Sequence, residues 1–159
     1  MNKQKIISIV IILSVILIDQ LTKYGFFALV DENGGTIEVL PFFNLVKVYN
    51  TGVSFGMGGS VENSHLIFSL LALAIVAVLC YFLFKEENKW HAYAYSLIIG
   101  GAIGNIIDRV LIGGVMDFLD FHAYGYHWPA FNVADSTIFI GVAVLIFIPA
   151  TTKNLRKES

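Results

Sequence analysis

The chain has 159 residues and a formal net charge of −2; 57% of its residues are hydrophobic and 14% are charged. Soluble domains contain about 45–50% apolar and about 25% charged residues, so this composition excludes an ordinary soluble domain. The ten basic residues form no patch suited to nucleic acid, and we expect an α-helical integral membrane protein.

Four stretches are long enough to cross a bilayer, for which about 20 apolar residues are needed. They cover about 6–27, 66–84, 93–112 and 133–150. Two lysines precede the first stretch, as in a cleavable signal peptide, but no small-x-small cleavage site follows it. We therefore interpret all four stretches as retained transmembrane helices.

The polar segment after the first helix has the composition of a small sheet. Residues 36–40 and 43–49 are typical of short strands, and Pro41 separates them. We expect a β-rich segment over about 34–60 that lies on the membrane surface.

Basic residues set the expected orientation of the chain. They lie at the N-terminus, in the turn between the second and third helices, and in the tail: Lys3, Lys5, Lys85, Lys89, Lys153, Arg156 and Lys157. These three places fall on one side of a four-helix protein, and by the positive-inside rule that side is the cytoplasm. We expect both termini to be cytoplasmic, the β-rich segment to be extracytoplasmic, and residues 1–159 to form a single domain.

Several acids fall within or beside the helices, where charge is costly. At 1.5 Å per residue, Asp19, Asp108 and Asp135 lie roughly 20–27 Å from the cytoplasmic edge. That depth is in the outer third of a hydrocarbon core about 30 Å thick. Asp117 follows the third helix at a similar level, so the four acids are expected in one layer near the outer leaflet.

Each of these acids also has a purely structural interpretation. Asp19 and Lys23, spaced i, i+4, can neutralise each other beside a site rather than in one. Asp108 and Arg109 can mark an interfacial helix end, with the arginine extended toward headgroups. Asp135 can cap the fourth helix.

The remaining candidate ligands have simpler interpretations. We expect Asp120 and the four histidines in exposed loops or at the interface, because the histidines show no ligand spacing: His65, His91, His122 and His127. The single cysteine, Cys80, excludes an internal disulfide and lies in an apolar run, where it is expected to be a small hydrophobe.

Other features favour a site. Residues 101–105 place small residues one turn apart, which allows close helix approach, with Asn105 able to hydrogen-bond across helices. Asp117 and Asp135 then follow in poorly solvated surroundings, where two carboxyls cannot easily both ionise and one retains a proton. A charged carboxylate that activates water, beside a protonated one that polarises a carbonyl, is the pair that an aspartic peptidase requires.

Four sequence blocks occur in order over 19–136. They are Asp19–Lys23 (DQLTK), Asn50–Gly56 (NTGVSFG), Gly104–Arg109 with Val115–Phe118 (GNIIDR and VMDF), and Phe131–Ser136 (FNVADS). Together these blocks resemble the bacterial lipoprotein signal peptidase family, the type II signal peptidases. In the second block, Val53 and Ser54 stand where alanines are common.

The resemblance implies four transmembrane helices with an extracytoplasmic β-rich cradle, and a catalytic pair formed by Asp117 and Asp135. It implies supporting or substrate-contacting roles for nine further residues: Asp19, Lys23, Asn50, Gly52, Asn105, Asp108, Arg109, Asn132 and Ala134. It also implies a multi-pass enzyme of the bacterial cytoplasmic (inner) membrane that uses no metal or cofactor, with its active site near the outer leaflet. The implied substrate is a prolipoprotein with a diacylglyceryl group on its future N-terminal cysteine, cut just before that cysteine. We expect a monomer in contact with membrane lipid.

Two other functions stay open at the level of sequence. Asp108, Asp117 and Asp120 could bind Mg²⁺ in a membrane phosphotransferase, although their spacing does not match the acidic signature of lipid alcohol phosphotransferases. A small transporter or proton channel could use the intramembrane acids as a relay. Four helices are few for that function, and the acids gather in one layer.

Overall fold

The computed structural model describes residues 3–52 and 64–149, and within these ranges it contains four helices and four strands. The helices are α1 (Lys3–Glu32), α2 (Ser64–Lys85), α3 (Lys89–Ile112) and α4 (Val133–Phe147). The strands are β1 (Thr36–Leu40), β2 (Phe43–Asn50), β3 (Val115–Ala123) and β4 (Tyr126–His127). The end of the second sequence block, over 53–56, and the basic tail lie outside the described residues.

Of the described helices, α1, α2 and α3 are long and apolar enough to cross a membrane. The helix α4 has 15 residues, which corresponds to about 22 Å. It ends before the expected boundary at 150 because Pro149 disfavours helical backbone in the preceding residue, and Ile148 is extended.

The helix α1 runs five residues past its expected end at 27, because its last turns pack under the sheet. Phe27 and Val30 are buried against Leu45 of β2 and against Met116 and Phe118 of β3. Complete burial of a large apolar side chain contributes about 1.5–3 kcal/mol. This cluster therefore joins the end of α1 to the sheet.

The described strands form one antiparallel sheet in the order β1-β2-β3-β4. The strands β3 and β4 were not expected, because the sequence analysis placed β structure only at about 34–60. The missed strand β3 begins with residues 115–118, all of which are buried. A strand that is covered on both faces lacks the polar–apolar alternation by which strands are found in a sequence.

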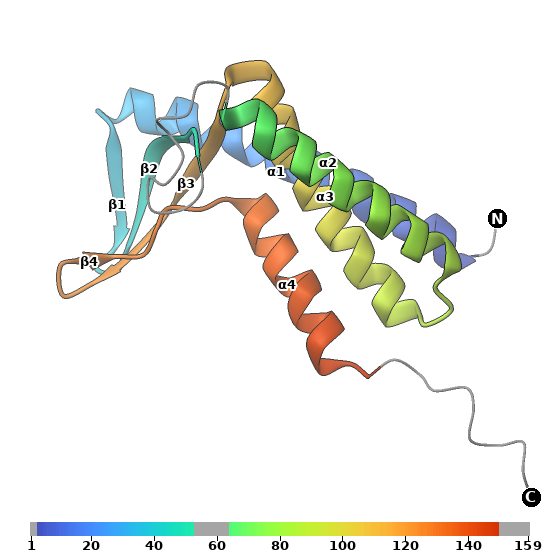
Figure 1. Ribbon diagram of the computed structural model, residues 1–159. Helices are drawn as coiled ribbons and strands as arrows, with labels where there is room; N and C mark the ends of the chain where they lie inside the picture. The colour runs from blue at the N-terminus through green and yellow to red at the C-terminus, as the bar shows by residue number, and fades with distance from the viewer. Residues whose placement is uncertain (1–2, 53–63, 150–159) are drawn as a thin grey trace, which may run out of the picture.

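The sheet lies at one end of the helices, and the N-terminus and the α2–α3 turn lie at the other end (Figure 1). The helices α1, α2 and α3 run side by side, whereas α4 starts at the sheet and packs chiefly against α3. The first turn of α4 therefore lies beside the last turns of α3 and the start of β3. This junction brings the polar sequence blocks together.

Close approach of the helices at this junction depends on two glycines of α3. A Cβ atom at Gly101 would lie 2.5 Å from the carbonyl oxygen of Ala134, and one at Gly104 would lie 2.5 Å from Asp19 Oδ2. Neither distance leaves room for a methyl group. The predicted role of the small residues over 101–104 is confirmed.

Candidate active site

Asp117 and Asp135 line one cavity of about 590 Å³ where the sheet meets the helices. Asp117 lies on β3, and Asp135 lies in the first turn of α4. Asn50, Gly52 and Arg109 line the same cavity. The two carboxyls proposed from the sequence as a pair thus face a common space.

Asp117 is 2% exposed, and both of its carboxyl oxygens accept hydrogen bonds from side-chain amides. Asn132 Nδ2 donates to Oδ1 at 2.7 Å, and Asn50 Nδ2 donates to Oδ2 at 3.1 Å. Asn50 is itself oriented, because its Oδ1 accepts a hydrogen bond from the Gly52 backbone N–H at 3.2 Å. The end of β2 and the cap of α4 therefore hold this carboxyl between them.

Asp135 lies at the third position of α4 and completes the cap of that helix. Asn132 Oδ1 accepts from the Asp135 N–H at 2.9 Å, and Asp135 Oδ2 accepts from the Asn132 N–H at 3.3 Å, which is a capping box. The other oxygen, Oδ1, accepts from Asn105 Nδ2 at 2.8 Å. The capping interpretation holds in part: Asn132 is the cap residue, and Asp135 supports it while lining the cavity.

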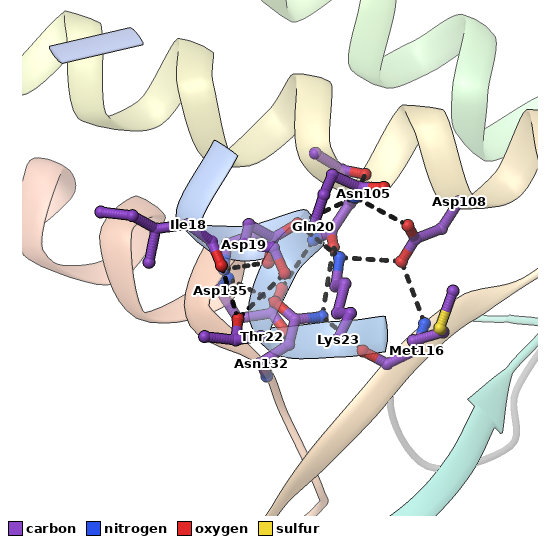
Figure 2. A network of polar contacts seen from close by, with 12 residues as sticks. Ile18, Asp19, Gln20, Thr22, Lys23, Asn105, Asp108, Met116, Asn132 and Asp135 are labelled. Carbon is purple, nitrogen blue, oxygen red and sulfur yellow. Dashed lines mark hydrogen bonds and ion pairs between the residues drawn. The ribbon is translucent and has the colours of Figure 1, made fainter. Parts of the chain in front are cut away.

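Asn105 connects this pair to a buried lysine (Figure 2). Its Oδ1 accepts from Lys23 Nζ at 2.9 Å and from Asn132 Nδ2 at 3.2 Å. Because an ammonium group can only donate, the carbonyl of Asn105 must face Lys23, and its NH₂ group must face Asp135. The lysine thereby fixes which way this amide points.

Lys23 is fully buried and lies between two carboxylates. Its Nζ is 2.8 Å from Asp19 Oδ2 and 2.8 Å from Asp108 Oδ2. Asp19 Oδ1 also accepts from the Ala134 N–H at 2.8 Å, and Asp108 Oδ2 accepts from the Met116 N–H at 3.1 Å. The predicted pairing of Asp19 with Lys23 is confirmed. The interfacial interpretation of Asp108 is wrong, because its side chain is 0% exposed and bound to the lysine.

The surroundings of Asp117 favour its protonated form. Burial, and secondarily the charge of Asp135, raise the pKa of Asp117 from 3.8 to about 7, although the hydrogen bonds from Asn50 and Asn132 act in the opposite direction. A carboxyl with a pKa near 7 can keep its proton while its neighbour is ionised. The pair can therefore offer one base and one acid at neutral pH.

Every residue proposed from the sequence as catalytic or supporting lies in the cavity wall or in the polar cluster around Lys23. Arg109 lines the cavity, and its Nη1 donates to the backbone carbonyl oxygen of Asn105 at 3.3 Å. Gln20 was missed, although it stands inside the first block. Its Nε2 donates to Asp108 Oδ1 at 2.9 Å and to the Gly104 carbonyl at 3.3 Å.

Two residues that were expected in exposed loops or at the interface are buried. Asp120 is 6% exposed and accepts from Asn44 Nδ2 at 3.1 Å and pairs with His127 Nδ1 at 2.8 Å. His91 is 7% exposed, and its Nε2 lies 2.7 Å from the Ile148 carbonyl oxygen. Both were missed because each has its partner on a different element. Among the described residues, no group of three or more His, Cys, Asp or Glu side chains is placed to hold a metal ion.

The chain has extensive similarity to known proteins. The family model described as "Signal peptidase (SPase) II" matches residues 11–150. The lipoprotein signal peptidase of Thermodesulfovibrio yellowstonii is 46% identical over 143 residues, which is 90% of each chain. That of Anaplasma phagocytophilum is 38% identical over 157 residues, which is 99% of this chain and 97% of the relative. A solved structure described as a bacterial membrane enzyme has a TM-score of 0.76 and 35% identity, and the match covers 96% of this chain and 93% of that chain.

An apolar helical fold with two carboxyls on one cavity has the features of a membrane-embedded aspartic peptidase. The match over most of the chain makes the assignment specific. The chain belongs to the signal peptidase II family, and it is an aspartic peptidase.

Proposed function

We propose that this protein removes the signal peptide from diacylglyceryl-modified prolipoproteins, cutting just before the lipidated cysteine with a water molecule activated by Asp117 and Asp135. The observation that carries the proposal is that these two carboxyls line one cavity. The relatives named as lipoprotein signal peptidases supply the substrate class.

In the proposed reaction, the ionised carboxylate of Asp135 accepts a proton from water while the water oxygen attacks the scissile carbonyl carbon. The protonated carboxyl of Asp117 donates a hydrogen bond to the carbonyl oxygen, so that negative charge on this oxygen is stabilised. The C–N bond then breaks, and the leaving amine takes up a proton from the pair. Asn105 and Asn132 keep both carboxyls in place throughout.

Apolar surface beside the pair suits a lipid-modified substrate. A second space of about 490 Å³ opens at Asp135, and its wall includes Phe131, Phe139 and Ile140. Such a wall can bury acyl chains or the apolar end of a signal peptide. Burial of apolar surface is favourable by about 25 cal/mol per Å². The polar reaction and the apolar anchoring are thus adjacent.

The proposed topology has four spans, both termini in the cytoplasm and a sheet that faces outward, in the bacterial inner membrane. It treats residues 1–159 as one monomeric peptidase domain. The lysines at the N-terminus and in the α2–α3 turn support this orientation by the positive-inside rule, because both lie at the end opposite the sheet (Figure 1). The active site is then near the outer leaflet, where the lipid of the substrate is found.

The metal-dependent alternative has no geometric support. Asp108 is bound to Lys23, Asp120 is bound to Asn44 and His127, and Asp117 faces the cavity with Asp135. These three carboxylates therefore have separate partners and do not converge on one ion.

A cleavage assay tests the proposed reaction. Purified protein in detergent is given a prolipoprotein with or without its diacylglyceryl group, and the products are weighed by mass spectrometry. We expect cleavage of the lipidated precursor immediately before the modified cysteine, with chelator present or absent. Failure of well-folded protein to cut a properly lipidated precursor would overturn the proposal.

Labelling with a membrane-impermeant maleimide tests the topology. In a Cys80→Ala background, the substitutions Tyr124→Cys and Glu87→Cys are made singly. Tyr124 is fully exposed in the turn between β3 and β4, and Glu87 lies in the α2–α3 turn. We expect label at position 124 in intact spheroplasts and at position 87 only after lysis. The reverse pattern would show that the orientation is inverted.

A further inference from the structure

A cavity of about 540 Å³ lies on the sheet beside the catalytic cavity. Trp128, Pro129 and Ala130 line both cavities and form the ridge between them. The proposed reaction does not use this cavity, which we name the sheet cavity. Its remaining wall comes from β1, β2, β3 and β4: Thr36, Asn44, Val46, Val48, Asp120 and His127.

The sheet cavity contains hydrogen-bond acceptors that are held in place by buried contacts. Asp120 is 6% exposed, and its carboxylate is fixed by Asn44 Nδ2 at 3.1 Å and His127 Nδ1 at 2.8 Å. The NH₂ group of Asn44 donates to Asp120, and no donor among the described residues reaches the buried Oδ1 of Asn44. A buried carbonyl oxygen without a donor is costly and therefore needs an explanation.

The wall of the sheet cavity contains one carboxylate, that of Asp120, and neither lysine nor arginine. Glu38 of β1 lies outside the wall, but it is the cross-strand partner of Asn44, so its side chain leaves the sheet on the same face. Lys47 of β2 also lies outside the wall and is bound at 2.6 Å to Asp31. A ligand that brings N–H groups or positive charge suits these surroundings, and an acidic ligand does not.

The two cavities also define a direction for a bound polypeptide. One end of the catalytic cavity continues along α4 over Ile138, Phe139 and Val142. This apolar end suits the membrane-spanning signal peptide. At the other end of the catalytic cavity lies the ridge, and beyond the ridge the wall of the sheet cavity is made by residues of the strands. The chain that follows the cut must leave by a polar route, and the sheet cavity adjoins the catalytic cavity at this ridge.

We propose that the sheet cavity binds the first residues after the lipidated cysteine of the substrate and selects there for hydrogen-bond donors and cations over acidic side chains. Asp120 and Asn44 are the specificity-determining residues, and His127 is a positioning residue that holds Asp120. The inference rests on the proposed function and adds to it a site for the mature part of the substrate.

The test is a substrate series in which only the two residues after the lipidated cysteine change, between a Lys-Lys and an Asp-Asp version. The value of kcat/KM is measured for both versions with the wild type and with Asp120→Asn. We expect the wild type to prefer the Lys-Lys version, and Asp120→Asn to reduce this preference about tenfold, chiefly through KM. A ratio between two substrates on one preparation is independent of the fraction of folded enzyme.

The control variant is Asp31→Asn, which makes the same change at an exposed carboxylate outside the sheet cavity. It should leave the preference as in the wild type. An equal preference in the wild type and in Asp120→Asn would overturn the inference while cleavage itself continues. If the wild type cuts neither lipidated version, the proposed function fails instead, so the two failures are distinguishable.

Discussion

At the scale of single residues, the orientation of two side-chain amides organises the site. Lys23 and the Asp135 N–H act only as donors. The side-chain carbonyl oxygens of Asn105 and Asn132 therefore face these donors, and their NH₂ groups face the two carboxyls of the cavity. A buried ammonium thus acts on Asp135 without touching it. Substitution of this lysine is therefore expected to affect the stability of the site as well as its geometry.

Lys23→Met removes the charge and keeps the volume. Asp19 and Asp108 then lose their buried cation, and loss of one partner of a buried ion pair costs about 3–5 kcal/mol. We expect a large drop in melting temperature in detergent, partly restored in Lys23→Met/Asp108→Asn. The matched control is Lys47→Met, whose ion pair with the exposed Asp31 is screened by solvent and contributes little to stability. Equal melting temperatures for the two lysine variants would contradict the account.

The raised pKa of Asp117 predicts how stability varies with pH. Between pH 3.8 and about 7 the folded state keeps a proton that the unfolded state has released, so the stability contributed by this group falls as pH rises. Asp117→Asn removes the ionisable group. We therefore expect the variant to melt at a higher temperature than the wild type at pH 8, with a gap that narrows toward pH 4. A difference in melting temperature that is independent of pH would mean that the pKa of Asp117 is not raised in the folded state.

The same shift predicts the alkaline limb of activity. In the proposed reaction the working form of the pair holds one proton, and Asp117, with its pKa of about 7, loses this proton as pH rises. We expect kcat/KM for a lipidated precursor to fall above pH 7, approaching tenfold per pH unit. Constant kcat/KM up to pH 9 would rule out the protonated carboxyl of Asp117 as the acid.

At the scale of elements, the junction of α1, α3 and α4 depends on glycine residues of α3. Gly104→Ala places a methyl group 2.5 Å from Asp19 Oδ2 and should displace the carboxylate from Lys23. We expect lower stability and a large loss of activity. Gly25→Ala in α1 is the matched control, since nothing lies within 4 Å of its added methyl group. In a helix, alanine is more favourable than glycine by about 1 kcal/mol, so this variant should be no less stable than the wild type. A fully active, stable Gly104→Ala would contradict the close packing.

The helices, the first two strands and the small-residue contact of α3 could be predicted from hydropathy, turn residues and spacing. Asp117 and Asp135 were also singled out, because acids among apolar neighbours are conspicuous in a sequence. The strand β3 could not be found, since it is buried on both faces at its start. The contacts from Lys23 to Asn105 and from Asp120 to Asn44 join elements far apart in the chain, and no local pattern encodes them.

At the scale of the whole molecule, polar chemistry is concentrated at one end of an apolar bundle. The sheet lies at that end (Figure 1), and the ion cluster around Lys23 lies between the helices (Figure 2). The cavity with Asp117 and Asp135 lies beside this cluster. Water and a peptide bond can meet there while lipid surrounds the remaining helix surface. The proposed reaction requires these two carboxyls to act together.

The measurement that tests this most directly is the cleavage rate of a lipidated precursor by Asp117→Asn and by Asp135→Asn, with Asp31→Asn as the matched surface control. All three proteins are first shown to be folded by their melting curves. We predict that each cavity variant loses at least about a hundredfold in rate, because a positioned acid or base contributes about 10²–10⁴-fold, and that the control stays close to wild type. A rate near that of wild type for either cavity variant would contradict the account.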